Sequence, residues 1–162
     1  PIVCAVQGTA AGAGLSLCVS ADLVVAVDSS KFTSAYTKAG LSPDGSSTYF
    51  LPRRIGDRRA RELMLTNRVL SAAEAESWGL VNQVVPEDQL TETTSALVSM
   101  MTAGPTRAFG AVKRLLNESS HTSLETQMEL ETREIASCAM SEDGQEGISA
   151  FLAKRAPSYR GQ

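Results

Sequence analysis

Apolar residues in the first third of the chain form short continuous runs, a pattern typical of buried parallel strands. Ile2–Val6 and Leu23–Val27 are two such runs, and residues 80–85, which Pro86 ends, are predicted to form a further strand. Residues 13–21, between the first two runs, combine helix-forming and apolar side chains and predict a helix. Strand, helix and strand in this order indicate an α/β fold.

The rest of the chain is patterned for helices. Ser71-Ala-Ala-Glu74 is a capping box that predicts a helix start, and Gly79 predicts its end. On the helix before it, we expect Leu63, Met64 and Leu65 to face inward. After residue 45, the expected helices are 46–55, 58–66, 71–78, 87–103, 105–118, 122–139 and 142–154.

Composition and charge exclude several classes of protein. The 162 residues carry a net charge of −3, which disfavours nucleic acid as a partner because phosphate binding needs a basic surface. No apolar run is long enough to cross a membrane. The three cysteines lack metal-ligand spacing, and His121 is the only histidine, so no metal site is expected. The cysteine pattern predicts no disulfide framework and favours the cytoplasm.

Small residues fill the segment between the first strand and the first helix. Residues 8–14 read Gly-Thr-Ala-Ala-Gly-Ala-Gly. A turn of this kind at a helix start exposes backbone N–H groups that can stabilise an oxygen as it becomes negative during a reaction. The alternative is a turn kept only for packing. The glycine spacing does not match the dinucleotide-binding pattern.

Asp44 is the candidate acid of the chain. It lies in Ser-Pro-Asp-Gly, residues 42–45, which on local sequence is a turn: proline presets φ, aspartate bonds its own backbone, and glycine permits positive φ. An acid near the small-residue turn would also be placed to move a proton beside a polarised carbonyl. The local sequence leaves both interpretations open.

Together with the sequence Phe-Leu-Ala-Lys-Arg at residues 151–155, these segments resemble the crotonase (enoyl-CoA hydratase/isomerase) superfamily. The resemblance spans Ile2 to Gly161 and is closest to the PaaG-like branch of phenylacetate-pathway acyl-CoA isomerases. That branch shares Lys-x-Gly-Leu-x-Pro-Asp, Phe-Leu-Pro-Arg and the tail Glu146–Arg155. The N-terminal half of the family pattern is absent. Since the first residue is Pro1 rather than Met, we expect a fragment or a processed product.

The resemblance implies a fold and two domains. Residues 1–56 would be the C-terminal half of a ββα spiral core. Residues 57–162 would be a helical region that mediates oligomerisation, as a homotrimer or a dimer of trimers. Coenzyme A would enter as part of the thioester substrate, with no separate cofactor.

The resemblance also implies roles for individual residues. The N–H of Ala13 would form half of an oxyanion hole, and the other donor belongs to the absent half. The two glutamate positions of hydratases are Ser16 and Tyr36 here, and neither can serve as a carboxylate base. Asp44 would instead shuttle a proton in an isomerase. The residues expected to bind the substrate are Gly12, Gly14, Tyr36, Leu41 and Pro43.

At the C-terminus, the resemblance assigns Phe151 and Lys154 to the adenine and phosphate end of coenzyme A. The two residues are three apart, which predicts that they share one helix face. The expected activity is a double-bond shift, or the opening of a ring epoxide to an oxepin, in a CoA thioester. The alternatives are an enoyl-CoA hydratase, an aryl-CoA dehalogenase, or a truncated paralogue that only binds acyl-CoA or oligomerises.

Overall fold

The computed structural model describes residues 1–162 and divides into two compact units. The first unit comprises residues 2–96, and the second comprises residues 97–162 together with Pro1. This boundary differs from the predicted division into residues 1–56 and 57–162. The physical reason is that two strands after residue 56 pair with strands that precede it, so the chain up to residue 96 packs as one body.

Two small sheets form the framework of the first unit. One has the order β1-β3-β6 with all strands parallel, and the other has the order β2-β4-β5 with only β5 antiparallel. The strands are β1 (Val3–Val6), β2 (Thr9–Ala11), β3 (Leu23–Val27), β4 (Lys31–Thr33), β5 (Leu70–Ser71) and β6 (Gln83–Val85). The segment β1-β2-α1 is followed by β3 and β4, which pair in parallel with β1 and β2 respectively. The chain therefore forms successive layers of a spiral.

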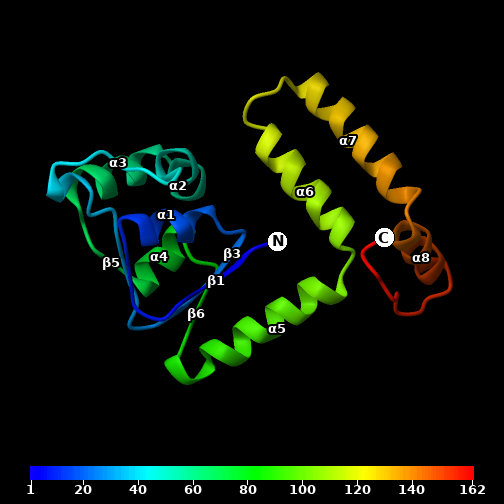
Figure 1. Ribbon diagram of the computed structural model, residues 1–162, viewed down its shortest axis with the longest axis horizontal. Helices are drawn as coiled ribbons and strands as arrows, with labels where there is room; N and C mark the ends of the chain where they lie inside the picture. The colour runs from blue at the N-terminus through cyan, green and yellow to red at the C-terminus, as the bar shows by residue number, and fades with distance from the viewer. The chain divides into compact units, whose positions relative to one another are not determined.

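Helices complete the first unit. They are α1 (Ala13–Ser20), α2 (Ser47–Ile55), α3 (Asp57–Thr66) and α4 (Ala72–Trp78), with the short 3₁₀ turns η1 (Thr37–Ala39) and η2 (Glu87–Gln89). Figure 1 shows α2 beside α1 and α3 beside α2. The helices bury Leu15, Leu51 and Leu63 in a core that also contains Phe32 of β4. The apolar runs of the sequence therefore form one core that supports the start of α1.

One inward-facing residue was predicted wrongly on α3. Leu63 is fully buried, and Met64 is partly buried against the core, but Leu65 is 71% exposed. Two residues apart on an α-helix point to nearly opposite sides, so Leu63 and Leu65 cannot both face the core.

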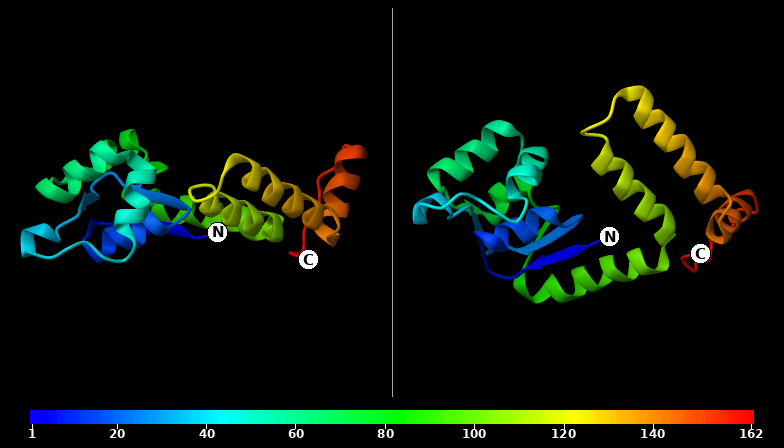
Figure 2. Two further views of the ribbon diagram at one scale, coloured as in Figure 1. Left: turned by 90° about the horizontal axis from the view of Figure 1, so that it is seen from above. Right: turned by 45° about the horizontal axis from the view of Figure 1, so that its top comes forward.

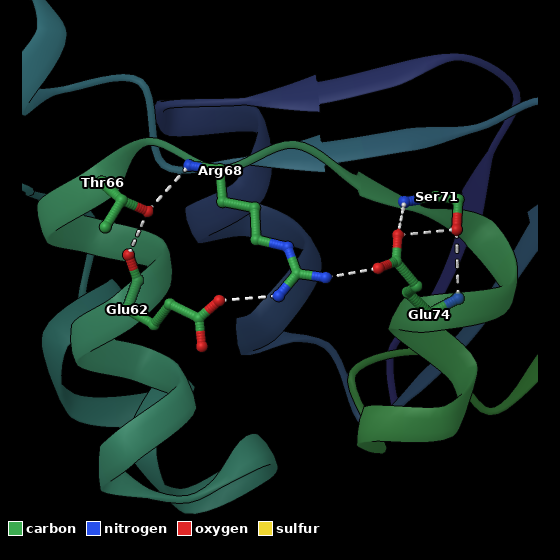
Figure 3. Close-up of polar contacts among 5 residues, drawn as sticks. All are labelled: Glu62, Thr66, Arg68, Ser71 and Glu74. Carbon is green, nitrogen blue, oxygen red and sulfur yellow. Dashed lines mark hydrogen bonds and ion pairs between the residues drawn. The ribbon is translucent and has the colours of Figure 1, made fainter.

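A polar network joins α3 to α4 (Figure 3). The Arg68 guanidinium donates to Glu62 Oε1 at 2.6 Å and to Glu74 Oε1 at 2.5 Å. Glu74 Oε2 accepts from the Ser71 backbone N–H, and the Ser71 hydroxyl caps the Glu74 N–H, which confirms the predicted capping box. The hydrogen bond from the Ser71 backbone N–H lowers the pKa of Glu74 most, and the bonds with the Ser71 hydroxyl and Arg68 lower it further. These contacts hold the start of α4 against the end of α3.

Trp78, at the end of α4, lies close to two arginine side chains. The guanidinium carbon of Arg59 is 5.0 Å from the indole ring centre, and that of Arg68 is 5.1 Å from it. Both distances suit cation–π attraction. The indole is half-buried and packs against the core of the first unit.

The second unit is helical. Its helices are α5 (Leu90–Ala103), which begins in the first unit, α6 (Thr106–Glu118), α7 (Leu124–Ala139) and α8 (Glu142–Leu152). Helices α6 and α7 form an antiparallel hairpin, clearest in the right view of Figure 2. Arg114 on α6 bonds both carboxylate oxygens of Glu134 on α7. None of the helices combines the length and hydrophobicity needed to cross a bilayer.

Candidate active site

The turn between β2 and α1 places free N–H groups at the start of the helix. Gly12 adopts a positive φ of 54°, which turns the chain from β2 into α1, and its N–H donates to the Thr33 carbonyl at 3.3 Å. The Ser16 N–H donates to the Gly12 carbonyl at 3.0 Å and closes the first helical turn. The N–H groups of Ala13 and Gly14 precede that bond, so they have no partner within the helix. Both residues are exposed.

Asp44 lies in a loop that is held by hydrogen bonds to the backbone carbonyl of Asp44 itself. The Asp44 carbonyl accepts from the Ser16 hydroxyl at 2.9 Å, from the Ser47 hydroxyl at 2.9 Å and from the Ser47 N–H at 3.2 Å. Ser16 is on α1 and Ser47 begins α2, and both are buried. The Asp44 residue itself is exposed. The loop is therefore anchored on two helices, with its acid at the surface of the first unit.

Gly45 allows the loop to approach α1 closely. Its φ is +58°, and a Cβ atom at this position would lie 2.9 Å from the Ser16 Cβ. Real Cβ atoms do not come that close to another carbon, so any side chain at residue 45 would move the loop. The predicted Asp-Gly turn is thus also a packing contact against the first helix.

Tyr36 completes the cluster. Its hydroxyl donates to Asp44 Oδ1 at 2.5 Å and lies 3.3 Å from the Ser16 hydroxyl oxygen. Its ring borders the turn, because a Cβ on Gly12 would be 3.8 Å from the Tyr36 Cζ. The structure thus brings Gly12, Ser16, Tyr36 and Asp44 together from a turn, a helix and two loops.

Backbone strain gathers around this cluster. Ala35, next to Tyr36, and Ser46, two residues after Asp44, adopt positive φ angles of 59° and 65° although neither is glycine. Such conformations cost about 1–3 kcal/mol each and tend to collect at functional sites. The sequence does not signal them, since alanine and serine are not residues that positive φ selects.

Leu41 and Pro43 flank the same loop. The Leu41 N–H donates to the Tyr36 carbonyl at 3.0 Å, but the Leu41 side chain is 61% exposed. Pro43 is half-buried just before the acid. Contact of either residue with a substrate stays a prediction, as does contact with Gly12, Gly14 and Tyr36.

Phe151 and Lys154 lie in the second unit. The prediction that they share one helix face is wrong, because α8 ends at Leu152 and Lys154 adopts a positive φ of 55° beyond it. The Lys154 N–H bonds the Phe151 carbonyl and the Arg155 N–H bonds the Ala150 carbonyl, which closes the helix end. Phe151 is 82% exposed. Their predicted role in binding coenzyme A stays a prediction.

Two thiols of the first unit lie close together. A hydrogen bond from the buried Cys18 thiol lowers the pKa of Cys4 to about 7. The same bond, together with burial, raises the pKa of Cys18. Cys18 packs inside the core, whereas Cys4 is partly buried against it.

Comparison with known proteins places these features in a family. The sequence pattern of the enoyl-CoA hydratase/isomerase family matches residues 1–162. The chain is 41% identical over its whole length to a 1,2-epoxyphenylacetyl-CoA isomerase of Escherichia coli. It is 35% identical over 154 residues to a 4-chlorobenzoyl coenzyme A dehalogenase of Arthrobacter. It spans 62% of the length of the first relative and 56% of the second.

A solved structure shows the same fold. The crystal structure of an enoyl-CoA hydratase/isomerase from Cupriavidus metallidurans superposes with a TM-score of 0.93 at 35% identity. The match covers 99% of this chain and 61% of that chain. The predicted α/β fold followed by a helical region is confirmed.

Proposed function

This chain belongs to the enoyl-CoA hydratase/isomerase family, in the PaaG-like branch of the crotonase superfamily, and we propose that it is part of an acyl-CoA isomerase in which Asp44 shuttles a proton. Relatives of this chain are named as isomerases, hydratases and dehalogenases. The choice among these activities rests on the residues around Asp44.

The observation that carries the proposal is how the Asp44 loop packs on Ser16. Residue 16 is 2% exposed, and the Asp44 carbonyl and Gly45 cover it. A glutamate there, as hydratases have, would need space that the loop already fills. Tyr36 takes the second hydratase position and bonds Asp44. Asp44 is therefore the carboxylate that this cluster offers for proton transfer.

The proposed reaction starts from the thioester carbonyl of a 3-enoyl-CoA. The Ala13 N–H and a second donor from outside this chain would hold its oxygen, which makes the α proton more acidic. Asp44 would take that proton, and the negative charge would rest on the carbonyl oxygen as an enolate. Asp44 would then return the proton at the γ carbon, giving the conjugated 2-enoyl thioester. Gly12 and Gly14 would let the substrate carbonyl approach the turn.

The same residues would serve the opening of a ring epoxide, the reaction for which the Escherichia coli relative is named. Coenzyme A enters either reaction as part of the substrate. Phe151 and Lys154 are proposed to contact its adenine and phosphates. A dehalogenase remains the second candidate, because an Arthrobacter dehalogenase is 35% identical, but Asp44 would then attack an aromatic ring.

We also propose that the full-length protein is a homotrimer or a dimer of trimers. The second unit exposes large apolar side chains, among them Leu124, Ile135 and Met140 at 72%, 71% and 84%. A groove of about 530 Å³ between α6 and α7 has a largely apolar lining. An apolar groove together with exposed apolar side chains is typical of an interface.

The test replaces Asp44 by asparagine in the full-length protein. Formation of the conjugated 2-enoyl thioester from 3-enoyl-CoA is followed, and turnover in Asp44→Asn is expected to fall by about 10²–10⁴-fold while CoA-thioester binding persists. Asp88→Asn, which neutralises an exposed acid in η2, is the matched control and should retain full turnover. Near-normal turnover in Asp44→Asn would mean that Asp44 is only a turn residue and does not transfer the proton.

A further inference from the structure

We propose that Tyr36 is a positioning residue that holds Asp44 Oδ1, so that Oδ2 is the oxygen that exchanges the proton with the substrate. This inference rests on the proposed function and adds the group that orients its acid. It also changes the part expected of Tyr36, from a residue that binds the substrate to one that acts through Asp44.

The contact between the two side chains is specific to one carboxylate oxygen. The Tyr36 hydroxyl donates to Oδ1 at 2.5 Å. A phenol has a single proton to donate, and here the carboxylate receives it. Tyr36 therefore offers no free donor to a substrate carbonyl. Because Oδ1 is occupied, the other oxygen of Asp44 is left to take up and return a proton.

The backbone N–H and the backbone carbonyl of Tyr36 are both hydrogen-bonded. Its N–H donates to the Ser34 carbonyl at 2.8 Å, and its carbonyl accepts from Ala39 at 2.9 Å and from Leu41 at 3.0 Å. The preceding residue, Ala35, has the strained φ of 59°. A side chain mounted on such a backbone keeps one orientation, which is what a supporting group of a catalytic residue requires.

Ser16 connects the hydroxyl and the loop. Its Oγ lies 3.3 Å from the Tyr36 hydroxyl and donates to the Asp44 carbonyl at 2.9 Å. The backbone and the side chain of Asp44 are thus held by two neighbouring hydroxyl groups that come from different elements. With both the backbone and the carboxylate held, rotation of the Asp44 side chain would break the Tyr36 bond.

The experiment compares Tyr36→Phe with the wild-type full-length protein on 3-enoyl-CoA. The substitution keeps the ring and removes only the hydroxyl. Loss of a hydrogen bond to a charged group predicts a fall in kcat of about 10- to 100-fold with little change in KM. Tyr159→Phe, the same chemical change in the C-terminal segment, should leave kcat unchanged. Circular dichroism of each variant checks its folding.

A double variant separates positioning from a general structural effect. In the Asp44→Asn background, measured at high enzyme concentration, Tyr36→Phe should cause no further loss, because the group it positions is gone. The proposal is overturned if Tyr36→Phe raises KM and leaves kcat unchanged, if kcat does not fall, or if the loss persists in the Asp44→Asn background. Normal turnover in Asp44→Asn itself would instead overturn the proposed function.

Discussion

At the scale of single residues, the position of Asp44 depends on the absence of a side chain at Gly45. Gly45 combines a φ of +58° with a backbone so close to α1 that a Cβ would lie 2.9 Å from the Ser16 Cβ. Gly40, five residues earlier, has a similar φ of +71° with nothing within 4 Å of such a Cβ. Both glycines have a positive φ, and they differ in how closely other atoms approach.

Gly45→Ala and Gly40→Ala are therefore a matched pair. Both should lose about 1–2 kcal/mol of unfolding free energy, because alanine is disfavoured at positive φ. Gly45→Ala should lose more, and its turnover should fall by about 100-fold because the Asp44 loop is displaced. Chemical denaturation and 3-enoyl-CoA turnover measure both effects. Equal stability and equal turnover in the two variants would show that the contact with Ser16 has no consequence.

The candidate site could be predicted from the sequence only in part. The resemblance to the crotonase superfamily singles out Asp44 and Ala13, because the motifs that carry it are local in the chain. The bond from Tyr36 to Asp44, and the contact of Ser16 with a loop 28 residues later, follow from the path of the chain through η1 and the loop. No local pattern encodes that path. The strained φ of Ala35 has no sequence signal at all.

At the scale of elements, the segment after α8 is tied to that helix by a bidentate ion pair. Arg155 donates to both oxygens of Glu146, at 2.6 and 2.7 Å, and the Ser158 N–H donates to Glu146 at 2.9 Å. These bonds lower the pKa of Glu146 to about 2, and the bond from Arg155 has a larger effect than the bond from the Ser158 N–H. The C-terminal segment therefore depends on Glu146 being ionised.

This pair predicts a dependence of stability on pH. Because the pKa of Glu146 is lower in the folded protein than in the unfolded chain, its stabilising contribution is complete above about pH 4.5 and is lost as the pH falls towards about 2. Glu146→Gln should lower the melting temperature at pH 7, and the difference from wild type should shrink on acidification. Thermal melts at several pH values measure it. Glu131→Gln, at an exposed position of α7, is the control; the same pH dependence there would contradict the assignment.

Element prediction succeeded where the periodicity was strong and failed where pairing is distant. The capping box at Ser71 and the long helices of the second unit follow from local patterns. Strand β2 (Thr9–Ala11) lies inside the expected turn, and only its pairing with Lys31–Thr33 makes it a strand. The strand expected from residue 80 begins at Gln83, because Leu80 and Val81 instead bond back to Ala75.

At the scale of the whole molecule, the chain corresponds to 62% of the length of its Escherichia coli relative. Assembly is therefore a property to test on the full-length protein. Native mass spectrometry should give three or six times the subunit mass. Association should persist at high salt, because apolar burial is not screened by ions. A monomeric mass throughout a dilution series into the micromolar range would contradict the proposed trimer.

The placement of Trp78 beside Arg59 and Arg68 in the first unit has an optical consequence. Trp78 is the only tryptophan of the chain, and it belongs to the unit of residues 2–96. Its fluorescence therefore reports the unfolding of that unit alone, while far-ultraviolet circular dichroism follows the helices of both. Coincident transitions by the two signals would mean that the units melt as one cooperative body, and separate transitions would mean that each unfolds by itself. The chain thus carries a built-in spectroscopic probe of the half that holds Asp44.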